Sequence, residues 1–319
     1  MIGNSSINEI SLAEVWAAWR AFRLGKKATR EILFFESELE DNLFSISEAL
    51  NSKQYRHGGY QHRIVDEKKR RDIYVATVRD RVVHRIVYDR LVAVFDPKFD
   101  TDVWSCRKGK GLIGAAKRVQ KILRQNSECH IWRGDIQKYF ENINQSTILD
   151  ILKGREEVAQ ILWLLEEIVF SYPKGVPIGN LTSQIFANIY LDQFDKFIRQ
   201  LGVSGYVRYG DDFLVFGHSY RHMRQIRKIA TSFLAQKLGL TLSARNNIII
   251  RARDGTKFCG VLIYDKGFSI TGGSFSRMRQ KVTFKNGISY INIVDKLGSR
   301  RQQRTIRNIW GDQKLKSLC

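Results

Sequence analysis

Apolar residues recur at helical spacing over several long stretches of the chain. Within residues 11–50 the apolar positions at this spacing are Leu12, Val15, Trp16, Trp19 and Phe22. Recurrence every three or four residues predicts helices. The same pattern predicts a helix around residues 82–94 and others over 112–124, 146–170, 182–200 and 219–238, and we expect the tail from about residue 269 to be helical.

Shorter apolar or alternating runs between turn residues predict strands. They lie at 61–79, where the chain is expected to turn near Glu67 and Lys68, and at 129–135, 246–251 and around 258–262. Helices and strands do not follow one another in a regular βαβ order. The predicted fold class is therefore α+β and not a doubly wound parallel sheet.

A further hairpin is predicted at residues 205–216, and its turn carries two adjacent carboxylates, Asp211 and Asp212. The flanking positions are apolar, so we expect both arms to be buried, and Gly210 lets the chain turn tightly. Adjacent like charges repel each other, and a divalent cation with its preference for hard oxygen ligands would offset that repulsion. An isolated Gly-Asp-Asp segment is also typical of an ordinary surface turn.

A second acidic element favours the metal interpretation. Asp135 ends the predicted strand 129–135, although a lone aspartate at such a place is often only a helix N-cap. Together with Asp211 and Asp212 it would supply carboxylates from neighbouring strands. Two-metal nucleotidyl transfer needs such a set, because one cation activates the attacking hydroxyl and the other stabilises the leaving oxygen.

The charge of the chain favours a polyanionic partner. Its 53 Lys and Arg exceed its 32 Asp and Glu and give a net charge of +21, whereas an apolar content of 43% is ordinary for a globular protein. Nucleic acid is the first interpretation, anionic membrane the second, and a merely solvated basic surface the third. In the glycine-containing loop before residue 112, Arg107, Lys108 and Lys110 are candidates to contact the phosphates of a nucleic acid strand.

Cysteine usage and hydropathy indicate a reducing compartment. The four cysteines show no spacing typical of zinc sites or disulfides. No apolar run is long enough for a membrane helix, and the first residues lack the layout of a signal peptide. We therefore expect a cytoplasmic protein without a membrane partner, and one continuous body with subdomains.

Five segments resemble, in order and spacing, the motifs of reverse transcriptases. They are residues 71–84, 133–140, 175–184, 209–212 and 258–260. The resemblance extends roughly over 55–265 and implies a right-hand polymerase with an antiparallel palm sheet backed by helices. It implies fingers over 1–128, a palm over 129–265 and a short basic thumb over 266–319. The implied activity is RNA-dependent DNA synthesis with two Mg²⁺ ions, for which Mn²⁺ can substitute.

The resemblance also implies roles for single residues. Asp135 and Asp211 would bind both metals, Asp212 would complete the site, and the Ile136 carbonyl could add a ligand. Phe140 would stack under the sugar and exclude a ribose 2′-hydroxyl, with plain core packing as the alternative. The remaining positions are Lys69 and Arg71 for the triphosphate, with a solvated basic hairpin as the alternative, Ile178, Gly179 and Gln184 for nucleotide binding, and Phe258, Cys259 and Gly260 for the primer grip. Apart from the resemblance, the basic residues Arg300, Arg301 and Arg304 are candidates to bind nucleic acid, although an isolated basic tail is equally often only solvated.

The loop 175–184 is similar to that of reverse transcriptases from diversity-generating retroelements. Most reverse transcriptases carry a glutamine where this chain has Ile178 and a proline where it has Gln184. The resemblance implies error-prone copying at template adenines, in mutagenic retrohoming. An aliphatic Ile178 cannot donate hydrogen bonds that position template and nucleotide, so a mispaired nucleotide loses less binding free energy relative to a correctly paired one.

The implied partners are a template RNA, a cDNA primer–template, dNTPs and a small basic oligomeric accessory protein, and the implied host is bacterial, archaeal or a phage. One alternative is a reverse transcriptase of a retron or an antiphage defence system, although the loop signature argues against a retron. Residues 266–319 are also short for the extra domains of an intron protein. Another alternative is a catalytically idle RNA-binding scaffold, against which the three aspartates argue.

One departure from the family pattern affects the expected rate of nucleotide addition. The family's usual lysine after Leu240, Thr241 and Leu242 is replaced by Asn246. Asparagine cannot protonate the departing pyrophosphate, and the neighbouring Arg245 holds its proton too tightly. We therefore expect a slow enzyme.

Overall fold

The computed structural model describes residues 9–66 and 70–316. The chain divides into two compact units. Unit 1 comprises Met1–Phe99, Lys138–Gln193 and Lys237–Leu240, and unit 2 comprises Asp100–Gln137, Phe194–Gln236 and Thr241–Cys319.

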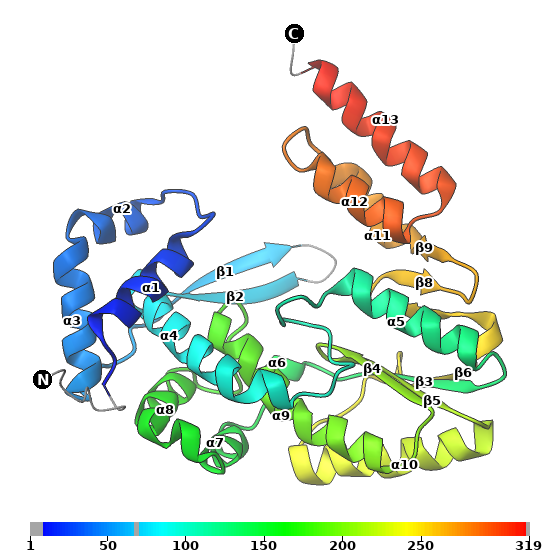
Figure 1. Cartoon of the computed structure of the whole chain (residues 1–319), viewed down its shortest axis with the longest axis horizontal. Helices are drawn as coiled ribbons and strands as arrows, with labels where there is room; N and C mark the ends of the chain where they lie inside the picture. The colour runs from blue at the N-terminus through cyan, green and yellow to red at the C-terminus, as the bar shows by residue number, and fades with distance from the viewer. Residues whose placement is uncertain (1–8, 67–69, 317–319) are drawn as a thin grey trace, which may run out of the picture. The chain divides into compact units, whose positions relative to one another are not determined.

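Unit 1 is mainly helical and carries a two-stranded antiparallel hairpin (Figure 1). Its elements are α1 (Leu12–Arg23), α2 (Arg30–Ser37), α3 (Leu39–Asn51), β1 (Tyr60–Asp66), β2 (Arg70–Ala76), α4 (Val78–Phe95), η1 (Asp96–Lys98), α6 (Tyr139–Asn142), α7 (Gln145–Lys153), η2 (Glu156–Ile161), α8 (Leu162–Phe170) and the first part of α9 (Leu181–Gln200). Helix α4 lies at the centre and packs against α1, α2, α3 and η2. The predicted hairpin is present, and its expected turn at Glu67 and Lys68 lies outside the described residues.

Side-chain caps explain where several of these helices begin. The hydroxyl of Ser11 accepts a hydrogen bond from the Glu14 N–H at the start of α1. Thr77 accepts one from the Asp80 N–H at the start of α4. Such oxygens satisfy N–H groups that have no partner within the helix.

Two expectations for unit 1 need correction. Helix α1 buries Val15, Trp19 and Phe22, which lie on the side that packs against α3 and α4, but Leu12 and Trp16 are exposed. The helix expected over 146–170 is interrupted: α7 ends at Lys153 and the 3₁₀ segment η2 precedes α8.

Unit 2 contains a four-stranded antiparallel sheet in the order β4-β5-β3-β6. The strands are β3 (His130–Asp135), β4 (Gly205–Tyr209), β5 (Asp212–Gly217) and β6 (Ile248–Arg251). Helix α5 (Leu112–Gln125) covers one face and α10 (Tyr220–Leu238) the other (Figure 1). Side chains of α5 share a core with Ile131, Val207 and Leu214. The predicted α+β fold with an antiparallel sheet backed by helices is confirmed.

The C-terminal part of unit 2 adds a small sheet and three helices. The strands β7 (Thr256–Phe258), β8 (Val261–Ile263) and β9 (Phe268–Ile270) are antiparallel. The helices are α11 (Gly272–Lys281), α12 (Gly287–Leu297) and α13 (Arg300–Lys316). Phe258, Val261 and Ile306 extend the core of α5. The helical tail was expected, whereas β9 was not.

No helix within residues 9–66 and 70–316 combines the length and the apolar character needed to span a bilayer.

Candidate active site

Three aspartates meet at one end of the sheet in unit 2. Asp135 is the last residue of β3 and lies opposite Asp212, the first residue of β5, in the antiparallel register. Asp211 occupies the turn before β5, and its carbonyl accepts a hydrogen bond from the Ile136 N–H at 3.3 Å. Like charges directly opposite each other destabilise a sheet. The arrangement therefore suits a place where cations bind.

The strands that carry the aspartates are deeply buried, as expected. Val207 on β4 and Phe213 and Leu214 on β5 have no exposed surface. A Cβ atom on Gly134 would lie 2.1 Å from the Phe213 ring. A glycine before Asp135 therefore lets β3 and the aromatic ring approach closely, which fixes the strand ends.

The turn between β4 and β5 is held on both sides of Gly210. Its N–H donates to Ser105 Oγ at 2.8 Å, and its carbonyl accepts from Arg208 Nη1 at 3.1 Å. Gly210 has a φ of +65°, and a Cβ atom there would meet nothing within 4 Å. The glycine is thus required for its backbone conformation and not for lack of space.

A buried ion pair supports this turn. Arg208 and Asp195 side chains are 0% exposed, with Nη2 and Oδ2 2.6 Å apart, and a second contact joins Nε to Oδ1 at 2.7 Å. Tyr206 also donates to Asp195 at 2.5 Å. Burial, followed by the charge of Asp195, raises the pKa of Tyr206 well above its usual value. This pair was not predicted from the sequence, although a charged residue within the apolar run 205–216 was the available signal.

A second set of ion pairs lies in the same unit. Arg199 makes a bidentate contact with Asp100 at 2.7 and 2.8 Å and reaches Asp102 at 3.1 Å. Arg118 makes its own bidentate contact with Asp102. Burial opposes ionisation of Asp100, but the hydrogen bonds from Arg199 and from the Asp102 N–H, together with the charges of Arg199 and Arg208, outweigh it and lower the pKa of Asp100. The loop that carries Ser105 is thereby tied to α9 and α5.

Two residues outside the paired strands contact the aspartates. Asn246 donates from Nδ2 to Asp135 Oδ2 at 3.1 Å, and Arg133 Nη2 approaches Asn246 Oδ1 at 3.5 Å. Cys259 places its Sγ 3.9 Å from Asp212 Oδ2. Burial raises the pKa of the Cys259 thiol, and the charges of all three aspartates raise it further. Cys259 is therefore in the electrostatic field of all three carboxylates.

The donor set fits a divalent cation in its chemistry. Asp135, Asp211 and Asp212 offer carboxylate oxygens, which are the ligands that Mg²⁺ prefers. Within residues 9–66 and 70–316, however, no three His, Cys, Asp or Glu side chains lie so that they could hold one metal ion together. Asn246 holds one oxygen of Asp135 in place.

The residues expected to bind the nucleotide lie in unit 1. The Phe140 carbonyl accepts a hydrogen bond from the Val176 N–H at 2.9 Å. The Ile178 carbonyl accepts one from the Tyr74 N–H on β2, also at 2.9 Å. Gly179 has a φ of +115°, and a Cβ atom there would lie 2.5 Å from Ile73. The structure thus brings Phe140, the loop 175–180 and β2 together.

Other predicted residues differ in their surroundings. Arg71 on β2, Gln184 on α9, and Arg300, Arg301 and Arg304 on α13 are exposed, as is Lys108. Arg107 Nη1 donates to the Asp100 carbonyl at 2.8 Å, and Lys110 Nζ lies 4.2 Å from the centre of the Trp104 ring. Gly260 has a φ of +82° next to Cys259. Lys69 lies outside the described residues.

Comparison with known proteins identifies the family to which the chain belongs. Residues 61–263 match the family model described as reverse transcriptase (RNA-dependent DNA polymerase). The match extends over more than half of the chain, so the chain belongs to the reverse transcriptase family.

Curated relatives include intron-encoded proteins. The chain is 22% identical over 238 residues to Protein YkfC of Escherichia coli K12, covering 60% of this chain and 62% of that protein. It is 25% identical over 146 residues to the group II intron-encoded protein LtrA of Lactococcus lactis subsp. cremoris, covering 43% and 24%. It is also 25% identical over 174 residues to an uncharacterized 91 kDa protein in a cob intron of Schizosaccharomyces pombe, covering 50% and 21%. The chain thus spans about a fifth to three fifths of these relatives.

Solved structures support the fold. Apo telomerase from Candida tropicalis superposes with a TM-score of 0.53 at 13% identity, covering 82% of this chain and 59% of that chain. Telomerase from Candida albicans with a fragment of telomeric RNA gives the same score and identity, covering 81% and 54%. The fold class is that of a right-hand polymerase, as the sequence predicted.

Proposed function

We propose that this chain is an RNA-dependent DNA polymerase whose chemistry takes place at Asp135, Asp211 and Asp212. One observation carries the proposal: Asp135 and Asp212 are paired in register at two strand ends, with Asp211 in the adjoining turn. Membership of the reverse transcriptase family supports it.

The aspartates would hold two Mg²⁺ ions, with Mn²⁺ as a substitute and the Ile136 carbonyl as a further ligand. When bound, these ions supply activation of the primer hydroxyl and stabilisation of the pyrophosphate that leaves. The Asn246 amide keeps the Asp135 carboxylate oriented. Arg208 and Ser105 hold the Gly210 turn, so that Asp211 and Asp212 need little reorganisation during the reaction.

Residues of unit 1 would bind the incoming nucleotide. Arg71 would contact the triphosphate through charge-assisted hydrogen bonds, together with Lys69. Phe140 would select deoxyribose by excluding a 2′-hydroxyl. The loop 175–180 supports this role because its backbone is joined both to Phe140 and to β2. Gln184, at the start of α9, would face the same nucleotide.

The basic positions outside these sites would bind the template–primer. Lys108, Arg300, Arg301 and Arg304 are exposed cations, and phosphate contacts of this kind position a duplex without reading its sequence. Arg107 and Lys110 would add positive charge to the same loop. The turn formed by Phe258, Cys259 and Gly260 would grip the primer, and its proximity to Asp212 supports this.

In functional terms we propose fingers over residues 1–128, a palm over 129–265 and a thumb over 266–319. The finer proposal is an error-prone enzyme of a diversity-generating retroelement that works with a basic accessory protein. Ile178 and Gln184 support it. A second candidate is an intron-associated reverse transcriptase, which the similarity to LtrA favours.

The first test is dNTP incorporation on an RNA template primed with oligo(dT) in the presence of Mg²⁺. We expect incorporation by the wild type and none by Asp211→Asn with an unchanged far-ultraviolet circular dichroism spectrum. Failure of the folded wild type, both alone and with the product of a neighbouring accessory gene, would contradict the proposal. Sequencing of the cDNA separates the two subtypes: errors concentrated at template adenines, and reduced by Ile178→Gln, support the retroelement enzyme.

A further inference from the structure

Unit 1 contains a hollow of about 600 Å³ that the proposed chemistry does not use. One wall is the segment that joins α3 to β1, with Lys53, Arg56 and Gly59, and the other is α8, with Trp163 and Phe170. Both walls belong to the same compact unit. The lining thus combines cations, aromatic rings and glycine backbone.

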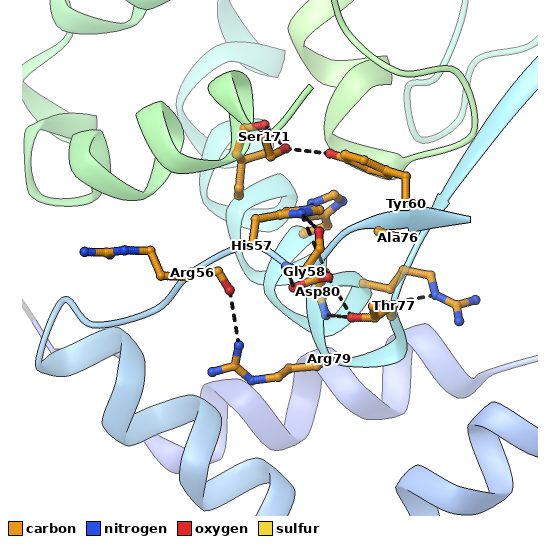
Figure 2. A network of polar contacts seen from close by, with 12 residues as sticks. Arg56, His57, Gly58, Tyr60, Ala76, Thr77, Arg79, Asp80 and Ser171 are labelled. Carbon is orange, nitrogen blue, oxygen red and sulfur yellow. Dashed lines mark hydrogen bonds and ion pairs between the residues drawn. The ribbon is translucent and has the colours of Figure 1, made fainter. Parts of the chain in front are cut away.

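A buried network fixes the first wall (Figure 2). His57 and Asp80 side chains are each 1% exposed. Asp80 accepts hydrogen bonds from the Tyr55 hydroxyl at 2.7 Å and from the Gly58 N–H at 3.2 Å. The ring of His57 contacts His84, with Nε2 atoms 3.0 Å apart. The wall is therefore ordered before any ligand arrives, which lowers the cost of binding.

The charged side chains at the hollow sum to a positive value, because the carboxylates Glu166 and Glu167 are outnumbered by Lys53, Arg56 and the neighbouring Lys153. Glu167 accepts a hydrogen bond from the His57 N–H at 2.9 Å, and Glu166 pairs with Lys153 at 3.3 Å. Lys53 and Arg56 are exposed, and neither forms an ion pair with a residue that the structure describes. Guanidinium and ammonium groups in this position favour a phosphate.

The aromatic rings favour a base beside that phosphate. Trp163 is half-buried on α8, and Phe170 at the end of the same helix is exposed. Proteins hold single-stranded nucleic acid by stacking bases on aromatic rings while cations follow the backbone. Gly59 leaves open space, because a Cβ atom there would meet nothing within 4 Å.

We propose that this hollow binds single-stranded RNA, with a base against Trp163 and the adjoining phosphate at Lys53 and Arg56. The proposal rests on the proposed function, since an enzyme that copies RNA must handle template that is still single-stranded. It adds a binding site that lies outside the predicted nucleotide-binding and primer-grip residues.

The test measures binding of a fluorescent single-stranded oligo(A) RNA, without primer, by fluorescence anisotropy. We expect Trp163→Leu to weaken binding about tenfold, because base stacking contributes strongly to such complexes. Arg56→Gln should lower the slope of log affinity against log salt by about 0.7, the value for one lost phosphate contact. Gly59→Leu should weaken binding by filling the hollow.

Matched controls are Phe34→Leu, an exposed aromatic residue on α2, and Lys27→Gln, an exposed lysine before α2. Neither lines the hollow, and each should leave the affinity within about twofold. Thermal unfolding of every variant checks that the fold is intact. If the three hollow variants bind like their controls, the proposal is overturned.

A second measurement locates the RNA directly. Oligonucleotides that contain 4-thiouridine are cross-linked to the wild type, and the modified peptides are identified by mass spectrometry. We expect adducts on residues 53–59 or on α8, and adducts confined to other segments would overturn the proposal. dNTP incorporation is measured in parallel: its absence contradicts the proposed function, whereas normal incorporation without adducts in the hollow contradicts this inference alone.

Discussion

The aspartate end of the sheet in unit 2 and the β1–β2 hairpin in unit 1 hold their charges in opposite ways. Beneath the Gly210 turn, Arg208 and Asp195 are both 0% exposed and joined by two hydrogen bonds. In the hairpin, the pair His62 and Asp72 is equally short at 2.7 Å, but its side chains are 46% and 55% exposed.

This difference separates two tasks. The buried ion pair fixes the position of Arg208, and Arg208 in turn holds the turn that carries Asp211. Exposed charges contribute mainly a field, which salt screens over a distance of about 10 Å. We therefore expect changes in the sheet to affect stability and the chemical step, and changes in the hairpin to affect substrate binding.

The largest effect is expected from Arg208→Met. Removal of the guanidinium leaves the Asp195 carboxylate buried without a compensating cation, which lowers the free energy of unfolding by about 3–5 kcal/mol. Urea denaturation measures this change. Arg63→Met on β1 is the control, since an exposed arginine changes stability by about 0.5 kcal/mol or less. Equal losses in both variants would remove the basis of the comparison.

The next effect concerns acid and the buried His84 at the base of the hairpin. Burial, followed by the charge of His57, lowers the pKa of His84 from 6.5 to about 3. The unfolded state then binds more protons between these values, so stability is present above pH 6.5 and is lost as pH falls towards 3. Between pH 6.5 and 5 the loss due to His84 is about 2 kcal/mol.

Denaturation curves of the wild type and His84→Gln at both pH values measure this contribution. We expect the variant to lose less stability than the wild type on acidification. Gln61→Ala, at an exposed position without an ionisable side chain, should retain the wild-type pH dependence. A parallel response of wild type and His84→Gln would contradict the assignment.

Asn246→Ala tests the orientation of Asp135. The amide holds one carboxylate oxygen at 3.1 Å, and loss of such an outer partner reduces metal affinity or activity about 10-fold to 100-fold. We expect a higher Mg²⁺ requirement for dNTP incorporation and a nearly unchanged melting temperature. A lower melting temperature with an unchanged Mg²⁺ dependence would show that Asn246 is structural only.

The smallest effect is expected from Arg71→Gln in the hairpin. The exposed cation would attract the triphosphate electrostatically and contact it directly, so the KM for dNTP should rise in the variant while kcat changes little. The rise should shrink at high salt, because screening already weakens the interaction in the wild type. Steady-state kinetics at two salt concentrations provide the measurement. A fall in kcat with an unchanged KM would assign Arg71 to the chemical step.

Much of this architecture follows from local patterns in the sequence. Apolar periodicity predicted α9 and α10, and the apolar arms around residues 209–212 predicted the β4–β5 hairpin. Asp135 could be placed at a strand end because the predicted strand 129–135 is a short segment whose apolar residues all precede its final aspartate. Such features depend on neighbouring residues alone.

The features that the sequence did not predict depend on contacts between residues that are distant along the chain. Asp195 lies on α9 and Arg208 on β4, and no local pattern joins them. Gly134 is necessary because the Phe213 ring lies against it, a closeness that only the sheet register creates. Strand β9 is too short for its alternation to stand out, and it forms because β8 offers an edge.

The central claim is that the paired strand ends in unit 2 carry the chemistry. Its most direct test compares the initial rate of dNTP incorporation for Asp135→Asn, at the end of β3, and Asp72→Asn, on the exposed hairpin. The account predicts that the initial rate falls at least about 100-fold in Asp135→Asn, because removal of a ligand should cost more than removal of a residue that only contacts a ligand. Asp72→Asn should retain a nearly unchanged rate. Comparable rates for the two folded variants would contradict it.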